Sequence, residues 1–169
     1  MTSVTVTKES TCNLDKSRVS KTEIKLATVD EMLAKASVLF EEHYEEIALN
    51  KQVMKLKPDE KAYHNLEKAN QLFILSAWQD DVLIGYSVNF VLNHPHYADL
   101  VLAQNDLLYI KKEMRGSRAG LKLIKQTETH AKSLGCKLML WHAKEDTTLA
   151  HMLPRLKYGV QDIIYSKEL

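Results

Sequence analysis

The stretch that decides the fold is Leu107-Leu-Tyr-Ile-Lys-Lys-Glu-Met-Arg115-Gly-Ser-Arg-Ala-Gly120-Leu-Lys-Leu-Ile124. Its pattern indicates the end of a strand, a polar turn and a helix that opens on small residues. Small residues let main-chain amides approach a ligand, and the first helical turn offers unpaired N–H donors with partial positive charge. The pattern therefore predicts an anion site suited to a diphosphate, to which Arg115 and Arg118 add positive charge. The alternative interpretation is a tight strand-to-helix turn with two solvated arginines.

The segments around this turn predict a βαβ unit. A strand over residues 100–110 leads into it, and apolar residues at helical spacing predict a helix over 120–134, which Gly135 would end. A short buried strand over 137–141 follows. Because a helix connects the two strands, they should be parallel neighbours joined by a right-handed crossover.

The rest of the chain predicts further strands and helices around this unit. Alternating residues favour a strand over 23–27, and Thr28 with Glu31 matches a capping box that begins a helix. A single apolar stripe then follows at helical spacing: Leu33, Ala36, Phe40, Tyr44 and Ile47. Pro58 suits the first turn of a second helix.

The remaining elements complete an α/β fold with a mixed sheet. Strands over 72–78 and 82–92 flank a polar turn and predict an antiparallel hairpin. A short helix over 147–156 and a last strand over 160–166 end the chain. The predicted order is β-α-α-β-β-β-α-β-α-β, with helices on the sheet faces. We expect residues 1–22 to form a flexible tail and residues 23–169 a single domain.

The bulk properties narrow the classes of partner. The formal net charge of +1 gives no electrostatic reason to expect a nucleic-acid or membrane partner. Cys12 and Cys136 cannot build a disulfide framework, which favours a reducing compartment. No apolar run approaches the roughly 20 residues that span a bilayer, and the first residues do not match a secretory signal. The sequence therefore predicts a soluble, cytoplasmic protein.

The turn at residues 115–120 resembles motif A of the GNAT (Gcn5-related N-acetyltransferase) superfamily, Arg/Gln-x-x-Gly-x-Gly/Ala. Arg115 matches the leading basic residue and Gly120 the final small residue, whereas Arg118 stands at the central glycine. The predicted order of elements is also that of the family, so the resemblance covers about residues 23 to 166. The strand end at residues 141–144, Trp-His-Ala-Lys, is similar to small members encoded by phages and prophages.

This resemblance implies acetyl-coenzyme A as cofactor, held in a cleft where the two parallel strands splay apart. The pantetheine arm would pair with the main chain of Leu108, Tyr109 and Ile110. The pyrophosphate would rest on the turn, whose remaining residues are Gly116, Ser117, Arg118, Ala119 and Gly120. Arg118 must swing out of the site or bind phosphate, with an ordinary φ angle.

Acyl transfer to an amine needs a base, an oxyanion donor and an acid for the leaving thiolate. Candidate bases are Asp106, where many family members carry Glu, and His142 after the neighbouring strand. Their alternatives are a turn or bulge carboxylate and a hydrogen-bonded strand-end histidine. The resemblance implies a main-chain amide of residues 108–110 as oxyanion donor. Leu153 stands where the family usually has its acidic tyrosine.

The acceptor site would have one wall near the end of the first helix. The four carboxylates of the run 41–46 could attract a cationic amine, such as a lysine or polyamine, whereas a solvated helix face is the alternative. Glu42, His43 and Glu46 are the candidate substrate-binding residues of this run. Tyr97 could lie at the cleft mouth. His94 and His96 lack a third ligand, so no metal site is expected. Cys136 is expected to be buried rather than nucleophilic.

The sequence thus predicts an N-acetyltransferase that acetylates a small-molecule or protein amine by direct attack in a ternary complex. A different class stays open: a weakly active or inactive binding or effector protein with this fold that docks on a host protein. A homodimer, paired through sheet edges or the last strand, is a further expectation.

Overall fold

The computed structural model describes residues 21–168, so the predicted tail lies almost entirely outside the described residues. The elements follow in this order: β1 (Glu23–Ala27), α1 (Val29–Lys35), α2 (Ser37–Ile47), α3 (Glu60–Lys68), β2 (Leu72–Gln79), β3 (Val82–Asn93), β4 (Val101–Ile110), the 3₁₀ turn η1 (Lys112–Met114), α4 (Ala119–Ser133), β5 (Leu138–Trp141) and α5 (Thr148–Arg155). The predicted βαβ unit is therefore β4, α4 and β5.

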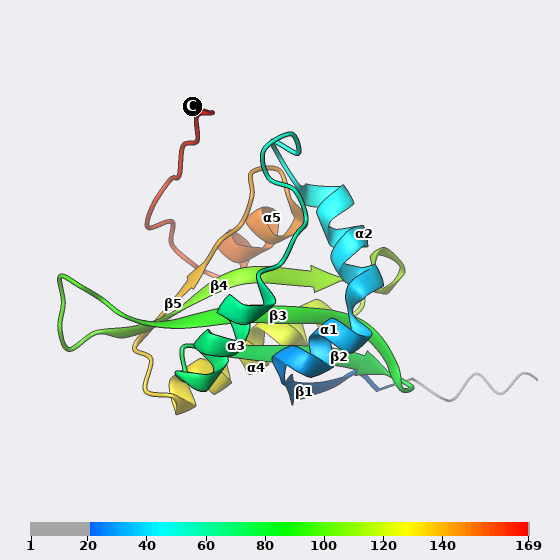
Figure 1. Ribbon diagram of the computed structural model, residues 1–169, viewed down its shortest axis with the longest axis horizontal. Helices are drawn as coiled ribbons and strands as arrows, with labels where there is room; N and C mark the ends of the chain where they lie inside the picture. Colours follow the sequence, from blue (N-terminus) through cyan, green and yellow to red (C-terminus); the bar gives the residue numbers. More distant parts are fainter. Residues whose placement is uncertain (1–20, 169) are drawn as a thin grey trace, which may run out of the picture.

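The strands form one mixed sheet in the order β1-β2-β3-β4-β5 (Figure 1). Neighbours from β1 to β4 are antiparallel, and β4 pairs with β5 in parallel, as the crossover predicts. The mixed α/β architecture predicted from the sequence is thus confirmed. β4 therefore belongs both to the antiparallel part of the sheet and to its parallel pair, and the connection after its carboxyl end is the crossover to β5.

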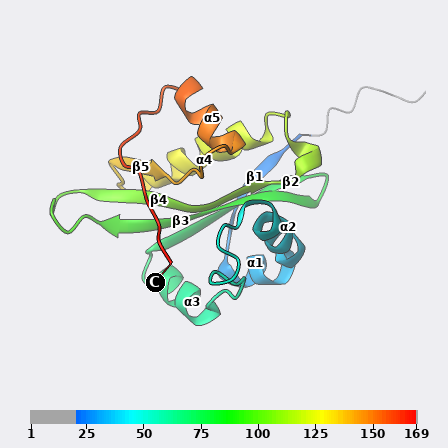
Figure 2. The ribbon, with the colours of Figure 1, turned by 90° about the horizontal axis from the view of Figure 1, so that it is seen from above.

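Helices cover both faces of this sheet (Figure 2). α1, α2 and α3 lie on one side, whereas α4 and α5 lie on the other. Buried residues of α1 and α2 pack on the first face, against Ile74, Tyr86 and Val88. Leu123 of α4 packs on the opposite face, against Leu75 and Ile84. The alternation of side chains along β2 and β3 supplies both hydrophobic layers, because both faces of the central strands are covered.

Two elements differ from the sequence expectation. The predicted single helical stripe is divided at Ala36, where α1 ends and α2 begins, and Ala36 is fully buried at the junction. The capping box of Thr28 and Glu31 at the start of α1 is confirmed. The predicted strand over 160–166 is wrong, because residues 158–168 contain no strand. A β-like sequence alone does not form a strand without a neighbour to complete its backbone hydrogen bonds.

The absence of a side chain at Gly85 of β3 allows the end of β4 to lie unusually close. A Cβ atom at this position would lie 2.4 Å from both the main-chain oxygen of Tyr109 and Cδ1 of Ile110. Glycine is the residue that permits such close backbone approach. The final residues of β4 are therefore pressed against β3, on the side away from β5.

No helix between residues 21 and 168 is long and apolar enough to cross a membrane.

Candidate active site

Strand β4 has a free edge beyond its pairing with β5. The parallel ladder joins Leu102–Asn105 to Leu138–Trp141 and ends there, although β4 continues to Ile110. On the other side, Asn105 pairs with Asn89 and Leu107 with Val88, so Asp106 is the extra residue of a β-bulge. A bulge bends its strand and redirects a side chain. The backbone from Asp106 to Ile110 thus leaves β5, and those of its polar groups that face away from β3 have no partner in β5, although the Ile110 oxygen accepts a hydrogen bond from Arg115.

The buried side chain of Asn105 spans this bulge. Its Nδ2 lies 2.9 Å from the main-chain oxygen of Leu107 and 3.2 Å from that of Val88. The same nitrogen also lies 3.1 Å from Oδ1 of Asn89 and 3.3 Å from Oγ of Ser87. Asn105 is only 1% exposed. A side-chain amide surrounded by acceptors on β3 and β4 therefore holds together the two strands where their regular ladder is interrupted.

The turn after β4 presents unpaired main-chain amides. Gly116 has a φ of 82°, which favours glycine, and Oγ of Ser117 accepts from the amide of Ala119 at 3.2 Å. Within the described part of the chain, no hydrogen bond uses the amides of residues 116–118, 120 or 121. These amides stand at the start of a 15-residue helix, where the partial charge is positive. The predicted anion site is thus geometrically available.

Neither Arg118 nor Gly120 fills this turn. Arg118 is exposed and has an ordinary φ of −81°, and its side chain makes no hydrogen bond or ion pair with any described residue. At Gly120, an added Cβ would meet only Cγ1 of Ile110, at an ordinary contact distance of 3.8 Å. The fold itself therefore has no steric need for glycine here, and the space above it is open to a ligand that approaches the backbone closely.

Arg115 faces away from the turn. Its Nε donates to the main-chain oxygen of Ile110 at 2.9 Å, and its two terminal nitrogens donate to the Glu46 carboxylate at 2.6 and 2.7 Å. This bidentate pair lowers the pKa of Glu46. The guanidinium also lies 5.4 Å from the ring centre of Tyr109. Arg115 therefore connects α2 to the end of β4, and its positive charge balances the negative charge of the Glu46 carboxylate.

The other carboxylates late in α2 also have partners. Glu42 accepts a hydrogen bond from the Tyr109 hydroxyl at 3.0 Å, and Glu45 pairs with Lys51 at 2.7 Å. Burial, followed by the bond to Glu42, raises the pKa of Tyr109 to about 12. With Glu46, these two carboxylates line a surface hollow beside Tyr109 and η1. Three of the four carboxylates in the acidic run, those of Glu42, Glu45 and Glu46, thus have side-chain partners, although all four glutamates are exposed.

His43 points into the protein and is only 5% exposed. Its Nδ1 lies 2.8 Å from the Tyr86 hydroxyl, and its ring stacks on Tyr109 with a centroid distance of 4.9 Å. Burial lowers the pKa of His43 to about 4, although Glu46 opposes this shift. The imidazole is therefore neutral near pH 7.

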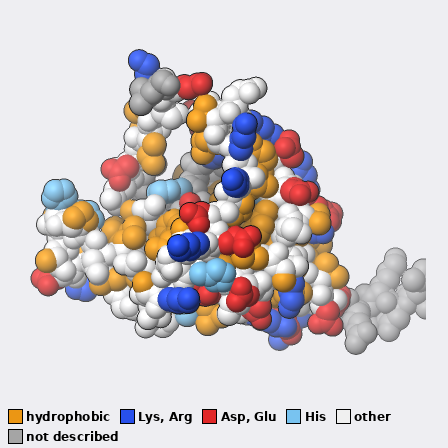
Figure 3. Space-filling model, in the orientation of Figure 1, with side chains coloured by type: hydrophobic (Ala, Val, Ile, Leu, Met, Phe, Trp, Pro, Cys, Tyr) orange, Lys and Arg blue, Asp and Glu red, His pale blue; other side chains and the backbone are white. Residues whose placement is uncertain are grey.

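A pocket of about 310 Å³ lies between α1–α3 and the sheet. Its floor is formed by Ile74, Tyr86, Val88 and Leu107, and its walls come from α1, α2, Tyr63 of α3 and the loop before α3. The lining is mainly apolar, with His43, Asp106 and Lys144 among its ionisable side chains. The face seen in Figure 3 shows hydrophobic side chains near its centre, interspersed with basic and acidic groups. The pocket reaches the β4 bulge through Asp106 and Leu107.

Asp106 has the surroundings of a weakly acidic carboxyl group. Although the residue as a whole is exposed, crowding around its carboxyl raises the pKa, and the charge of His142 and the Tyr63 hydroxyl act in the opposite direction. The Tyr63 oxygen lies 3.5 Å from Oδ2 of Asp106. The two predicted bases thus lie close enough to interact, next to the free edge of β4.

The family follows from these features together with the sequence. The sequence profile of the Acetyltransferase (GNAT) family matches residues 38–158, most of the described chain. The chain belongs to the GNAT acetyltransferase family. The resemblance of residues 115–120 to motif A of the GNAT family predicts a cofactor site at two places in this protein: the free β4 edge and the open turn before α4.

Solved structures show the same fold at low sequence identity. An aminoglycoside acetyltransferase from an uncultured soil metagenomic sample, in complex with sisomicin, has a TM-score of 0.66 and 16% identity over 88% of this chain and 96% of that one. The ribosomal-protein-alanine N-acetyltransferase of Brucella melitensis gives 0.63 and 17%, over 88% and 97%. The glucosamine-6-phosphate N-acetyltransferase of Arabidopsis thaliana gives 0.64 and 12%, over 88% and 98%. No curated protein sequence matches.

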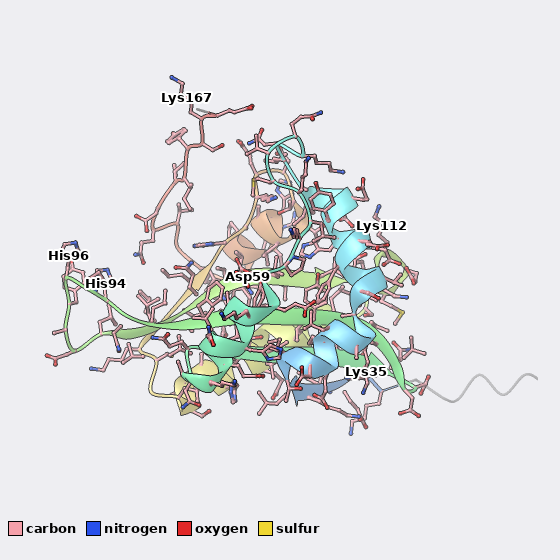
Figure 4. The ribbon with its side chains drawn as sticks, in the orientation of Figure 1. Lys35, Asp59, His94, His96, Lys112 and Lys167 are labelled. Carbon is pink, nitrogen blue, oxygen red and sulfur yellow. The ribbon has the colours of Figure 1, made fainter. Side chains whose placement is uncertain are left out.

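Tyr97, which was expected at the mouth of the cleft, does not lie at the candidate active site. It lies in the loop between β3 and β4, is 63% exposed, and has its ring 4.5 Å from that of His94. Figure 4 shows His94 and His96 at the tip of this hairpin, which projects away from α2. Tyr97 lines neither the pocket nor the hollow. Cys136 packs beside the third core cluster, and burial raises the pKa of its thiol.

Sequence reasoning missed several polar residues of the site. Asn105, Tyr63 and Tyr86 carry no motif, Lys144 entered only through the strand end at residues 141–144, and the partners of all four lie far away in the chain. For Asn105, Tyr63 and Tyr86 the available signal was a polar group within a strand or helix pattern, whereas Lys144 lies in the loop after β5. A polar residue at an inward position needs a buried partner, but the sequence does not say which.

Proposed function

We propose that this protein is an acetyl-coenzyme A-dependent N-acetyltransferase. The observation that carries the proposal is the free edge of β4, which runs directly into the open amides at the start of α4. The main chain of Leu108, Tyr109 and Ile110 would hold the pantetheine arm, and residues 116–120 the pyrophosphate, with Arg118 free to reach a phosphate. When bound, the thioester supplies the activated acetyl group. Arg115 would contribute by holding α2 against this edge rather than by touching phosphate.

The chain's own residues then assist attack by an amine. Asp106 accepts a proton from the amine, for which its raised pKa makes it a better base, and His142 lies close enough to share this role. A main-chain amide of the 108–110 segment donates to the developing oxyanion. Because Leu153 stands in place of the usual tyrosine, this position would supply no proton to the leaving thiolate.

Gly120→Trp tests the cofactor site. The indole would occupy the space above the turn, so we expect the affinity for coenzyme A to fall by about 100-fold or more, which corresponds to about 3 kcal/mol. The melting temperature without ligand should change little, because Gly120 has no close neighbour. Isothermal titration with coenzyme A and a thermal shift assay measure the two effects. Gly159→Trp is the matched control, because Gly159 has no atom within 4 Å that an added Cβ would meet.

If the wild-type protein neither binds coenzyme A nor is stabilised by it, the enzyme proposal fails. The other candidate is then a binding protein that retains the GNAT fold. The engagement of Arg115 by Glu46 and the leucine at position 153 favour that candidate. A protein partner whose capture is unaffected by Gly120→Trp would support it.

We also propose a homodimer in which residues 160–166 pair with β5 of a second copy. Val160, Ile163, Ile164 and Tyr165 are largely exposed, and β5 is an edge strand with an unpaired side. Burial of such a segment by strand addition would satisfy both its backbone and its apolar side chains. Deletion of residues 159–169 should convert a dimer into a monomer in light scattering. An unchanged mass would contradict this arrangement.

A further inference from the structure

We infer that the pocket between α1–α3 and the sheet binds an α-amino acid with a large apolar side chain. This inference rests on the proposed function and names its acceptor class: a primary amine that carries a carboxylate and an apolar group. The pocket combines apolar walls with separate acidic and basic groups. Those two features together define the ligand.

The walls require an apolar group. Met32 and Leu33 of α1, Phe40 of α2 and Ile74 of β2 face the pocket, whose accessible surface is mainly apolar. Its volume of about 310 Å³ lies at the lower end of small-molecule sites and suits a ligand of amino-acid size. A polar, multi-ring sugar would leave its hydroxyl groups unpaired against these walls, at a cost for each one.

The charges favour a ligand with a negative group. Lys55, Lys57 and Lys144 line the pocket, whereas Asp106 is the sole carboxylate among its lining residues. The carboxylates late in α2, which could attract a polycation, do not line this pocket, and Glu46 and Glu45 are paired with Arg115 and Lys51. A polyamine would therefore meet an excess of like charge, and a carboxylate would meet opposite charge.

Lys144 is held in a position to receive the carboxylate. Its Nζ donates to the main-chain oxygen of Ile47 at 2.7 Å, at the end of α2. An ammonium group has three donors, so this contact leaves two for a ligand. The charge of Lys144 also contributes to the lowered pKa of His43, which places the two side chains near each other at the pocket wall. The amine of the same ligand would lie at Asp106, beside the β4 edge.

The test compares ligands that differ in one group. Isothermal titration would measure L-phenylalanine, L-phenylalaninamide, phenethylamine and spermidine against the wild-type protein, each with and without saturating coenzyme A. L-Phenylalanine should bind about tenfold more tightly than phenethylamine or the amide, because only it offers a carboxylate to Lys144. Spermidine should bind more weakly than any of them.

Variants at one position identify the carboxylate partner. Lys144→Met should weaken L-phenylalanine binding by about tenfold and leave phenethylamine binding unchanged, whereas Lys144→Arg should retain most of the preference. Lys132→Met, on the exposed side of α4, is the control and should change neither. Thermal unfolding of each variant checks that the loss of the contact to Ile47 has not unfolded the domain. The comparison of ligands on the wild-type protein does not depend on any variant.

The outcomes separate this inference from the proposed function. Tighter binding of spermidine, or equal binding of phenylalanine and its amide, would overturn the inference even if coenzyme A binds. If phenylalanine binds with the expected preference but coenzyme A does not bind, the pocket assignment stands and the acetyltransferase proposal fails. Release of free thiol from acetyl-coenzyme A on addition of L-phenylalanine, but not of spermidine, would support both.

Discussion

Asn105→Leu should lower the free energy of unfolding by about 3 kcal/mol and also weaken coenzyme A binding by at least about tenfold. The leucine keeps the approximate volume but removes the amide that lies near the main-chain oxygens of Leu107 and Val88. Buried acceptors without a donor cost about 1–3 kcal/mol each, and the unpaired Oδ1 that Asn105 itself buries is lost at the same time. The bulge should then relax, and with it the direction of the free β4 edge.

Urea denaturation measures the first effect and titration with coenzyme A the second. Gln104→Leu is the matched control, since Gln104 is the neighbouring amide of the same strand and is not fully buried. A merely structural role would lower stability and leave the affinity of the remaining folded protein unchanged. Wild-type stability in Asn105→Leu would show that the bulge is held by the backbone alone.

Acidification from about pH 7.5 to about pH 4 should remove about 3 kcal/mol of stability through His43 alone. Burial lowers its pKa to about 4, whereas the unfolded chain has the ordinary value of about 6.5. The folded state therefore binds fewer protons, so the His43 contribution is present above about pH 6.5, is lost progressively as the pH falls from there toward about 4, and changes little below that. Lys144 and Arg115 disfavour the charged imidazole, and Glu46 favours it.

The measurement is a comparison of unfolding free energies at several pH values for the wild type and His43→Gln. The glutamine retains a polar group toward the Tyr86 hydroxyl but does not titrate, so the difference between the two proteins isolates His43. His94→Gln, at the tip of the hairpin between β3 and β4, is the control for replacing a histidine elsewhere in the chain. Parallel curves for the wild type and His43→Gln would mean that His43 is not buried in its neutral form.

The order of elements from β1 to α5 was predictable from local patterns, except that one predicted helix is divided into α1 and α2. Alternation and helical spacing are properties of adjacent residues, and the capping box at Thr28 depends on residues three positions apart. The strand predicted over 160–166 shows the limit of that reasoning. Its alternating apolar residues are real, but strand formation needs a neighbour, and no described strand lies beside it.

The candidate site likewise has some features that the sequence showed and others that it did not show. The turn with Gly116 and Gly120 was visible in the sequence, since a strand end, a turn and a helix start are contiguous. The roles of Arg115 and His43 were not visible, because Glu46 lies 69 residues from Arg115 and Tyr86 lies 43 residues from His43. A charged or aromatic residue can take any of several partners, and the packing of α2 on β4 selects among them.

The sequence by itself thus determined the βαβ unit and the turn of open amides, because both depend on spacing within a short segment. It also determined the family, because the motif lies in that same segment. The tertiary structure alone decided which carboxylates of α2 have hydrogen-bond or ion-pair partners, which way Arg115 faces and where the apolar pocket lies. Those outcomes depend on burial and on distances between remote segments. Such distances exist only after the helices have packed on the sheet.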